Sequence, residues 1–448
     1  MASNQGPVVV VILLVLLSVG VIYTLTQLLR SMLGEEETNS KEGYQDHWLF
    51  RLAINQLGYA TIFVPGILIY KYVKASKYLE RTGANCFSEL LRCCFVGQDS
   101  GERFLPADSS SVNSSSSSSA ARSAKQDALL LLLCVVGLQG SYLTWGLLQE
   151  KVMTQKYTND NGDVGAFKDS QFLVFVNRIL AFLLSGIYIT FTRQPRHPMP
   201  LYKYIYCSFS NIMSSWCQYE ALKYVSFPTQ VLAKACKVIP VMIMGKIVSH
   251  QKYENYEYLT AVTISLGMAS FMFGSTEMKG ETITTFSGLI LLCAYLTFDS
   301  FTSNWQSALF SQYKMSSVQM MCGVNLFSCL FTAVSLAQQG SFASSIAFMT
   351  QFPKFVVDCT LLSVSSAVGQ LFIFYTISVF GPVVFVIIMT VRQGLAILLS
   401  CLIYQHPISV VGMLGIAVVF SSLFLRIYCN QRIRALRRRM QNGSTTKV

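Results

Sequence analysis

Charged residues and histidines are scarce in this chain, and clustered cysteines are absent. Only 12% of its 448 residues are charged, whereas soluble globular domains carry roughly 25%. The four histidines, His47, His197, His250 and His406, fall outside the apolar runs, and the thirteen cysteines form no CxxC pair. The cysteines therefore indicate apolar packing and not a disulfide framework. Because no cluster of metal ligands or catalytic bases is visible, the sequence predicts neither an enzyme nor a bound metal or cofactor.

Apolar residues are abundant instead. They make up 52% of the chain, and long uncharged runs recur from end to end. A run of about 20 residues crosses a bilayer as a helix, in which the backbone satisfies its own hydrogen bonds, whereas a closed barrel needs short alternating strands. The sequence therefore predicts an all-α polytopic membrane protein. Its expected spans lie near residues 7–29, 52–70, 128–149, 170–192, 204–224, 226–249, 257–274, 286–303, 316–337, 355–378, 380–404 and 408–427.

A serine-rich segment separates the first two expected spans from the other ten. The run SSSVNSSSSSS cannot bury a core and is typical of a flexible, exposed linker. The predicted parts are N-terminal hydrophobic helices (1–75), a linker (76–127), a ten-helix core (128–427) and a basic tail (428–448). The first apolar run has no basic residue before it and is long for a leader peptide, so a signal anchor is favoured over a cleaved signal.

The distribution of basic residues predicts the orientation in the membrane. The chain has 34 lysines and arginines against 22 acidic residues, and the segment from Ile427 to Val448 contains six basic residues and no acidic one. The positive-inside bias therefore predicts that the tail and the linker face the cytosol. The sequon at Asn113 would then stay unmodified. Beside a membrane span, a basic tail attracts anionic lipid, and the net charge of +12 requires no nucleic acid.

Two lysines lie deep inside one of the expected spans. Lys237 is eleven or twelve residues from either end of the run 226–249, and Lys234 lies one helical turn before it. A lysine stem of roughly 6 Å does not reach an interface about 16 Å away. One interpretation is a structural ion pair with a buried acid. The other is a binding site for an anion, which the spacing favours because like charges at i and i+3 repel until an anion neutralises them.

Four further ionisable residues lie inside expected spans: Arg178, Glu220, Asp299 and Arg392. Arg392 is as deep as Lys237, and either it pairs with Asp299 or Glu220 or it faces the same ligand. Arg178 is shallower, about eight residues inside its span, and is either interfacial or part of the site.

Two prolines suggest an internal repeat. Pro228 precedes Lys237 by nine residues in the fourth core span, and Pro382 precedes Arg392 by ten in the ninth. Two five-helix halves with matching cation-bearing helices predict an inverted repeat. The substrate site of such a repeat lies near the bilayer midplane, between the halves.

Several segments resemble the nucleotide-sugar transporters of the drug/metabolite transporter superfamily. They are WGLLQEKVMT, YEALKYVSFPTQVLAKACKVIPVMIMGKIVS, FDSFTSNWQ, YKMSSVQMM and GQLFIFYTISVFGPVVFVIIMTVRQ. Within that family they are most similar to Golgi carriers of PAPS, adenosine 3′-phosphate 5′-phosphosulfate. The resemblance covers residues 129–425 and extends to FRLAINQLGYATIFVPG in the second span, but not to the first span or the serine-rich linker.

The resemblance implies a fold, a transport mode and a phosphate site. The expectation is a core of two inverted five-helix repeats that imports PAPS into the Golgi lumen by alternating access, in exchange for adenosine 3′,5′-bisphosphate or AMP. In relatives, basic residues of the fourth and ninth helices lie against the nucleotide phosphates, and the matching positions here hold Lys234, Lys237 and Arg392. PAPS carries about four negative charges, more than a UDP-sugar, which suits three cations with Arg178 as a further one.

Adenine recognition needs a stacking surface and hydrogen-bonding groups. The candidates within or at the ends of spans are Tyr142, Trp145, Gln149, Gln218, Tyr219 and Gln370. Tyrosine and tryptophan also anchor helices at membrane interfaces, so a purely structural role stays open for them. A UDP- or GDP-sugar antiporter of the same fold is the main alternative function, with a receptor or membrane-embedded enzyme as another. A homodimer is one oligomeric state that the sequence leaves open.

Overall fold

The computed structural model describes residues 6–34, 48–78, 86–97, 124–159, 164–167, 170–195, 199–221, 224–225, 233–234, 237–275, 286–313, 315–339, 342–403 and 410–445. Within these ranges the chain is helical apart from turns, short connections and one two-stranded hairpin. It forms two compact units. The first holds residues Met1–Phe104, Gly140–Phe209 and Tyr313–Leu371, and the second holds Leu105–Gln139, Ser210–Gln312 and Phe372–Val448.

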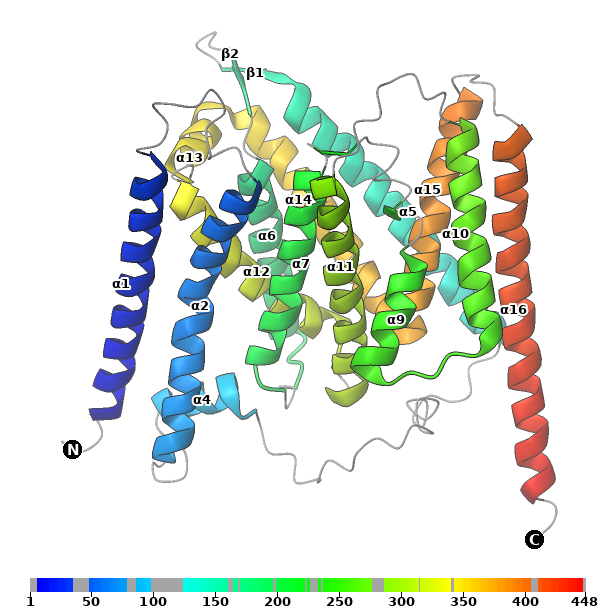
Figure 1. Cartoon of the computed structure of the whole chain (residues 1–448), viewed down its shortest axis with the longest axis horizontal. Coiled ribbons are helices and arrows are strands. Elements are labelled where there is room, and N and C mark those ends of the chain that lie inside the picture. Colours follow the sequence, from blue (N-terminus) through cyan, green and yellow to red (C-terminus); the bar gives the residue numbers. More distant parts are fainter. Residues whose placement is uncertain are drawn as a thin grey trace. The chain divides into compact units, whose positions relative to one another are not determined.

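The first unit is built mainly from long helices. Its elements are α1 (Gly6–Gly34), α2 (Trp48–Ser76), α4 (Cys86–Phe95), the second half of α5 (Ala124–Thr154), β1 (Lys156–Thr158), β2 (Val164–Ala166), α6 (Ser170–Phe191), the start of α7 (Tyr202–Ala221), α12 (Ser317–Gln339), α13 (Phe342–Gln351) and most of α14 (Pro353–Phe380). Helix α12 packs along α6, and α2 packs against both α1 and α12 (Figure 1). The second N-terminal helix is therefore a packed part of this unit.

Aromatic rings fasten α2 to the neighbouring helices. Tyr59 meets the rings of Phe209 and Phe331 edge-on, at centroid distances of 5.9 and 5.4 Å, and Phe63 lies 5.1 Å from Phe209. Edge-to-face pairs at such distances contribute about 0.5–1.5 kcal/mol each beyond the area that they bury.

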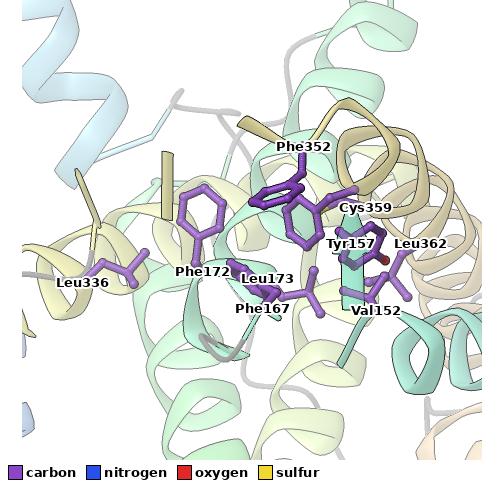
Figure 2. Close-up of a cluster of buried hydrophobic side chains, with 10 residues drawn as sticks. Val152, Tyr157, Phe167, Phe172, Leu173, Leu336, Phe352, Cys359 and Leu362 are labelled. Atoms are coloured by element: carbon purple, nitrogen blue, oxygen red, sulfur yellow. The ribbon is translucent and has the colours of Figure 1, made fainter. Parts of the chain in front are cut away.

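A hairpin caps one end of the first unit. Strands β1 and β2 are antiparallel, with Tyr157 opposite Gly165. A side chain at Gly165 would collide with the Phe352 ring, 2.8 Å from an added Cβ, so glycine lets the hairpin lie against that ring. Figure 2 shows the buried cluster beneath it, in which Tyr157, Phe172 and Phe352 gather with Leu362 from α14. Burial of these large apolar side chains stabilises this end of the unit.

One carboxylate ties the hairpin to two helices. The Lys151 ammonium at the end of α5 lies 2.8 Å from Oδ1 of Asp358 on α14. The buried Tyr157 hydroxyl donates a hydrogen bond of 3.2 Å to the other oxygen, Oδ2. Asp358 is 8% exposed, and a buried carboxylate needs such partners to remain charged.

The second unit holds the C-terminal helices. Its elements are the start of α5, the rest of α7, α9 (Val238–Ser249), α10 (Asn255–Ser275), α11 (Phe286–Tyr313), the end of α14, α15 (Pro382–Ile403) and α16 (Val410–Thr445). Helix α16 packs along α10, and α9 packs against both α10 and α15 (Figure 1). Gly267 makes the α10–α16 approach close, since an added Cβ would lie 3.0 Å from the Gly415 carbonyl oxygen.

Proline and glycine set two helix boundaries in this unit. Gly381 has a φ of +83° and its N–H donates to the Ile377 carbonyl oxygen, which ends α14, and Pro382 then opens α15. These are the positions that each residue favours, because glycine accepts a positive φ and proline lacks the N–H that a first-turn position does not use. Pro240 likewise lies in the first turn of α9. A helix running unbroken through 226–249 would bring Pro240 into its interior, where proline costs about 3 kcal/mol.

Six of the described helices are long and apolar enough to cross a membrane. These segments are Val8–Leu28, Gln126–Leu148, Gln171–Phe191, Phe286–Tyr313, Ser317–Ala337 and Pro353–Phe380, and shorter apolar helices cover Val238–Ser249, Pro382–Arg392 and Val410–Ser422. Leu16 and Leu17 on α1 are 64% and 66% exposed, as lipid-facing side chains would be. The predicted all-α polytopic class is confirmed. The count of twelve spans, the domain boundaries and the inverted repeat stay predictions, and most of the serine-rich linker lies outside the described residues.

Candidate functional site

Lys237 lies at the N-terminal end of α9. Its backbone N–H donates to the Lys234 carbonyl oxygen at 3.3 Å, and the Val241 N–H donates to the Lys237 carbonyl oxygen at 3.2 Å. Lys237 thus occupies the turn that leads into the helix. A helix N-terminus carries a partial positive charge and backbone N–H groups without intrahelical acceptors. Both features favour an anion at the same place where the sequence puts two lysines.

Asp299 is the ion-pair partner of Lys237. The ammonium of Lys237 meets Oδ2 of Asp299 on α11, and their side chains are 15% and 30% exposed. The sequence left two interpretations of Lys237 open, a structural ion pair with a buried acid or an anion site, and named Asp299 as a possible partner of Arg392; the structure pairs Asp299 with Lys237. The physical reason is that a cation deep in an apolar span lowers its desolvation cost by meeting a counter-charge.

A buried asparagine fixes the two helices that carry this pair. Asn304 on α11 is fully buried, and its side-chain amide nitrogen donates to the carbonyl oxygens of Val241 on α9 and Ser300 on α11, both at 2.9 Å. Gly245 allows the close approach, because an added Cβ there would lie 2.9 Å from Oδ1 of Asn304. Val241 is one turn after Lys237, and Ser300 is the neighbour of Asp299. The Asn304 bonds therefore hold the two charged groups opposite each other.

Lys234 and Arg392 add positive charge near Lys237. Lys234 is close enough to Lys237 for their charges to repel, and the same holds for Lys234 and Arg392 on α15. Helix α15 packs against α9, which explains how residues far apart in the sequence come together. The structure thus gathers three of the predicted site residues in one place in the second unit. Such a group suits a ligand with several negative charges.

The other predicted residues of the second unit lie on α7. Gln218 is half-buried and Glu220 is 5% exposed. The side chain of Tyr219 lies outside the described part of the chain, as does that of Gln149 at the end of α5.

A second group of predicted residues lies in the first unit. Oε1 of Gln370 on α14 accepts a hydrogen bond of 2.8 Å from the Asn325 amide on α12. The next residue back, Gly369, faces α5, where an added Cβ would lie 3.8 Å from the Tyr142 ring. Tyr142 thus lies near Gly369 on α14, whereas the Gln370 side chain is directed to α12. Arg178 on α6 is half-buried and lies near the Cys329 thiol of α12.

Tyr142 and Trp145 form a ring pair on α5. Their centroids are 6.2 Å apart at an interplanar angle of 72°, an edge-on arrangement. Trp145 also packs against the buried aromatic cluster beneath the hairpin. That contact gives Trp145 a structural role in this unit.

Asp358 was missed by sequence reasoning. It is the fourth residue of the expected span 355–378, and its carboxylate is one of the buried acids of the first unit. An acidic residue inside an apolar run was the available signal. Asn304 had no comparable signal, because a single asparagine in a span does not reveal which carbonyl groups it meets. Within the described ranges, no group of three or more histidine, cysteine or acidic side chains could hold a metal ion.

Comparison with known proteins agrees with a transporter. Residues 130–430 match the UAA transporter family. A Drosophila melanogaster protein named adenosine 3′-phospho 5′-phosphosulfate transporter 1 is 52% identical over 98% of this chain and 97% of its own length. The Homo sapiens protein of that name is 52% identical over 90% of this chain and 92% of its own length. The UDP-galactose/UDP-glucose transporter 5B of Arabidopsis thaliana is 37% identical over 66% of this chain and 88% of its own length.

Proposed function

Because the chain belongs to the UAA transporter family, we propose that it carries PAPS from the cytosol into the Golgi lumen in exchange for an adenine nucleotide monophosphate. PAPS is the activated sulfate that sulfotransferases consume, so the transport would supply sulfation in the lumen. The chain is a multi-pass membrane transporter and not an enzyme. The outgoing nucleotide in the proposal is adenosine 3′,5′-bisphosphate or AMP.

The choice of PAPS as the substrate rests on the names of the relatives. The Drosophila melanogaster and Homo sapiens relatives, which match 98% and 90% of the chain, are named for PAPS transport, whereas the Arabidopsis thaliana relative named for UDP-galactose and UDP-glucose matches 66% of it. A UDP- or GDP-sugar antiporter is the alternative, because such carriers share the family. The extra negative charge of PAPS favours the first assignment, since the ligand must satisfy several cations at once.

In the proposed site the cations of the second unit receive the phosphate and sulfate groups. Lys234 and Lys237 act as point charges, and Arg392 offers a planar fork that matches two oxygens of one group. Arg178 is the proposed fourth cation. Because Lys237 lies at the start of α9, the helix dipole adds to its attraction for an anion.

The adenine ring would be recognised by aromatic and amide side chains. The proposed contacts are Tyr142, Trp145, Gln149, Gln218, Tyr219 and Gln370. Since Oε1 of Gln370 accepts a hydrogen bond from Asn325, the group that Gln370 offers to a ligand is its amide NH₂, a donor that suits the ring nitrogens of adenine. Of the two aromatic residues on α5, Tyr142 is the more suitable ligand contact, because Trp145 packs against the hydrophobic cluster.

Helix pairing supports a core of two inverted five-helix repeats. Counted from α5 without the ten-residue α13, helices α6 and α12 are second and seventh, α9 and α15 are fourth and ninth, and α10 and α16 are fifth and tenth. Each of these three pairs packs together. In a repeat with a pseudo-twofold axis, helices near the axis meet their own counterparts, as these do. Such a core would work by alternating access, opening the site to the cytosol and to the lumen in turn.

A competition experiment tests the substrate. Purified protein in proteoliposomes should take up labelled PAPS, and unlabelled PAPS in excess should abolish that uptake while UDP-galactose and GDP-mannose leave most of it. Empty liposomes control for leak. Uptake of a labelled UDP-sugar without uptake of PAPS would move the assignment to the alternative, and breakdown of PAPS without uptake would favour an enzyme.

A further inference from the structure

The pairing of Lys237 with Asp299 raises the question of what the carboxylate does in a site that attracts anions. An acidic side chain beside a phosphate site repels the ligand and lowers its affinity. Its presence is explained if it stabilises another state of the carrier. The side chains of Lys237 and Asp299 are 15% and 30% exposed, although the carboxylate oxygen that meets the ammonium is itself buried. The Asp299 side chain must therefore turn away before a ligand can reach the ammonium.

The helix backbones hold the two groups in register. Asn304 joins the carbonyl oxygens of Val241 and Ser300 at 2.9 Å each, and these residues flank the two charged positions. The carboxylate therefore faces the ammonium without a movement of either helix. The Asn304 bonds involve only backbone acceptors, so they stay intact when the Asp299 side chain rotates. Such a rotation alone would expose the Lys237 ammonium to another anion.

The charges around Lys237 explain why the empty site needs a counter-anion. Lys237 is repelled by Lys234, which is also repelled by Arg392. Like charges close together at such depth are costly, and one carboxylate offsets part of that cost. A nucleotide with several negative charges offsets more of it. The ligand and Asp299 thus compete for the Lys237 ammonium, and the ligand displaces the carboxylate because it carries more negative charge.

We propose that Asp299 is the internal counter-anion of Lys237, which pairs with the ammonium in the empty carrier and gives way to the anionic group of the bound nucleotide. This inference rests on the proposed function for the identity of the nucleotide. During ligand release the Asp299 carboxylate pairs with the Lys237 ammonium again and displaces the ligand. Asp299 therefore lowers the affinity for the ligand and speeds its release.

Ligand binding to an Asp299→Asn variant tests the competition. Asparagine keeps the shape and removes the charge, so the empty site loses its counter-anion and PAPS should bind about tenfold more tightly, a change typical of one partly screened ion pair. Uptake should show a lower KM together with a lower maximal rate, because release becomes slower. Asp358→Asn is the matched control. It removes the acid of another lysine pair, Lys151–Asp358, which is no part of the site, and should leave the affinity unchanged.

A measurement on the empty protein separates this inference from the choice of substrate. Lys237→Gln and Asp299→Asn should each lower the melting temperature of the detergent-solubilised protein, and the double variant should regain most of the loss, since the two charges offset each other. If the losses in melting temperature of the two single variants add in the double variant, Lys237 and Asp299 do not stabilise each other and the proposed pair is wrong. Weaker or unchanged PAPS binding by Asp299→Asn would overturn the competition. If the wild-type protein binds no PAPS, the proposed substrate is wrong, and binding of inorganic pyrophosphate is measured instead. Tighter binding of pyrophosphate by Asp299→Asn than by wild type would support Asp299 as the counter-anion, and equal or weaker binding would overturn it.

Discussion

The side-chain amide of Asn304 holds the carbonyl oxygen of Val241 at 2.9 Å, which fixes the helix that begins at Lys237 against the helix that carries Asp299. Asn304→Ala removes this bond and the one to Ser300. The expected cost is about 1–3 kcal/mol of stability, because both bonds are buried. Uptake should fall by a larger factor than abundance, since Lys237 loses its fixed position.

The control for Asn304 is on the same helix. The Thr297 hydroxyl is exposed and donates only within α11, to the Cys293 carbonyl oxygen. Thr297→Ala should therefore change neither the melting temperature of the purified protein nor the uptake of labelled substrate. Equal effects of the two substitutions would show that Asn304 does not position α9.

Removal of the charge at Lys237 should abolish transport. Lys237→Ala leaves the proposed phosphate site without a central cation and Asp299 without its partner, so uptake should be lost while the protein still folds and reaches the Golgi. Lys237→Arg should restore uptake only in part, because a planar fork does not replace a point charge. Immunoblotting and microscopy check abundance and location beside the uptake assay. A parallel loss of abundance and uptake would mean that the ion pair is only structural.

The hairpin gives a prediction about pH. Burial, with a further contribution from the Asp358 carboxylate, raises the pKa of Tyr157 above its ordinary value of 10.0. The folded protein then holds the phenol proton more tightly than the unfolded chain, so this contribution to stability is complete below about pH 10 and is lost as the pH rises towards the folded pKa. Tyr157→Phe should cost about 1.5–3 kcal/mol at neutral pH, the value of a hydrogen bond to a charged group.

Thermal unfolding of wild type and Tyr157→Phe from neutral to alkaline pH measures this effect. The gap in melting temperature between the two proteins should narrow above about pH 10. The Lys151→Met variant is the comparison, because it removes the other partner of Asp358 and leaves the phenol in place. A gap between wild type and Tyr157→Phe that stays constant across this range would mean that the phenol does not titrate with the fold.

Helix positions were largely predictable from sequence. The expected span 170–192 became α6 at Ser170–Phe191, and 355–378 became α14 at Pro353–Phe380. Predominantly apolar runs of this length have few alternatives in a bilayer, so their positions follow from hydropathy. The hairpin around Tyr157 was not predicted, because strands of three residues leave no pattern. The late start of α9 at Val238 was also missed, although Pro240 carried the signal.

The partners of the charged residues were less predictable. Depth in the span singled out Lys237 and Arg392, and the structure brings both near Lys234. The sequence left Asp299 as a partner for Arg392, but the carboxylate meets Lys237. One sequence cannot decide between two cations for one acid, because the choice depends on which helices pack together. Binding of a nucleotide by these residues stays a prediction.

Topology can be tested with single cysteines. Helix α5 is long and apolar enough to cross the membrane between Gln126 and Leu148, so the serine-rich linker before it and the hairpin after it should face opposite sides. In intact Golgi vesicles, a cysteine at Ser116 or at Ser444 should react with an impermeant reagent from the cytosol, whereas Thr158→Cys should react only after permeabilisation. Exposed native cysteines such as Cys93 and Cys293 are first replaced by serine. A glycan on Asn113 would reverse the predicted orientation.

The proposed exchange mode rests on the repulsion among the cations of the site. Lys234 repels both Lys237 and Arg392, and the Asp299 carboxylate neutralises Lys237. An empty carrier must bring this like-charged group through a state closed on both sides, where low dielectric makes repulsion stronger. A bound anion removes the repulsion and lowers that barrier, so return of the carrier should be faster with a nucleotide than without one.

Counterflow in proteoliposomes tests this barrier directly. Uptake of labelled PAPS should rise severalfold when vesicles are preloaded with adenosine 3′,5′-bisphosphate or AMP, and much less with UMP, because UMP lacks the adenine ring. In Arg392→Gln one source of repulsion is gone, so the empty carrier should return more easily and the stimulation by preloading should shrink, although total uptake also falls. Equal uptake by empty and preloaded wild-type vesicles would reject obligatory exchange. Stimulation by UMP alone would assign the chain to UDP-sugar transport, since the outgoing nucleotide must fit the same site as the incoming one.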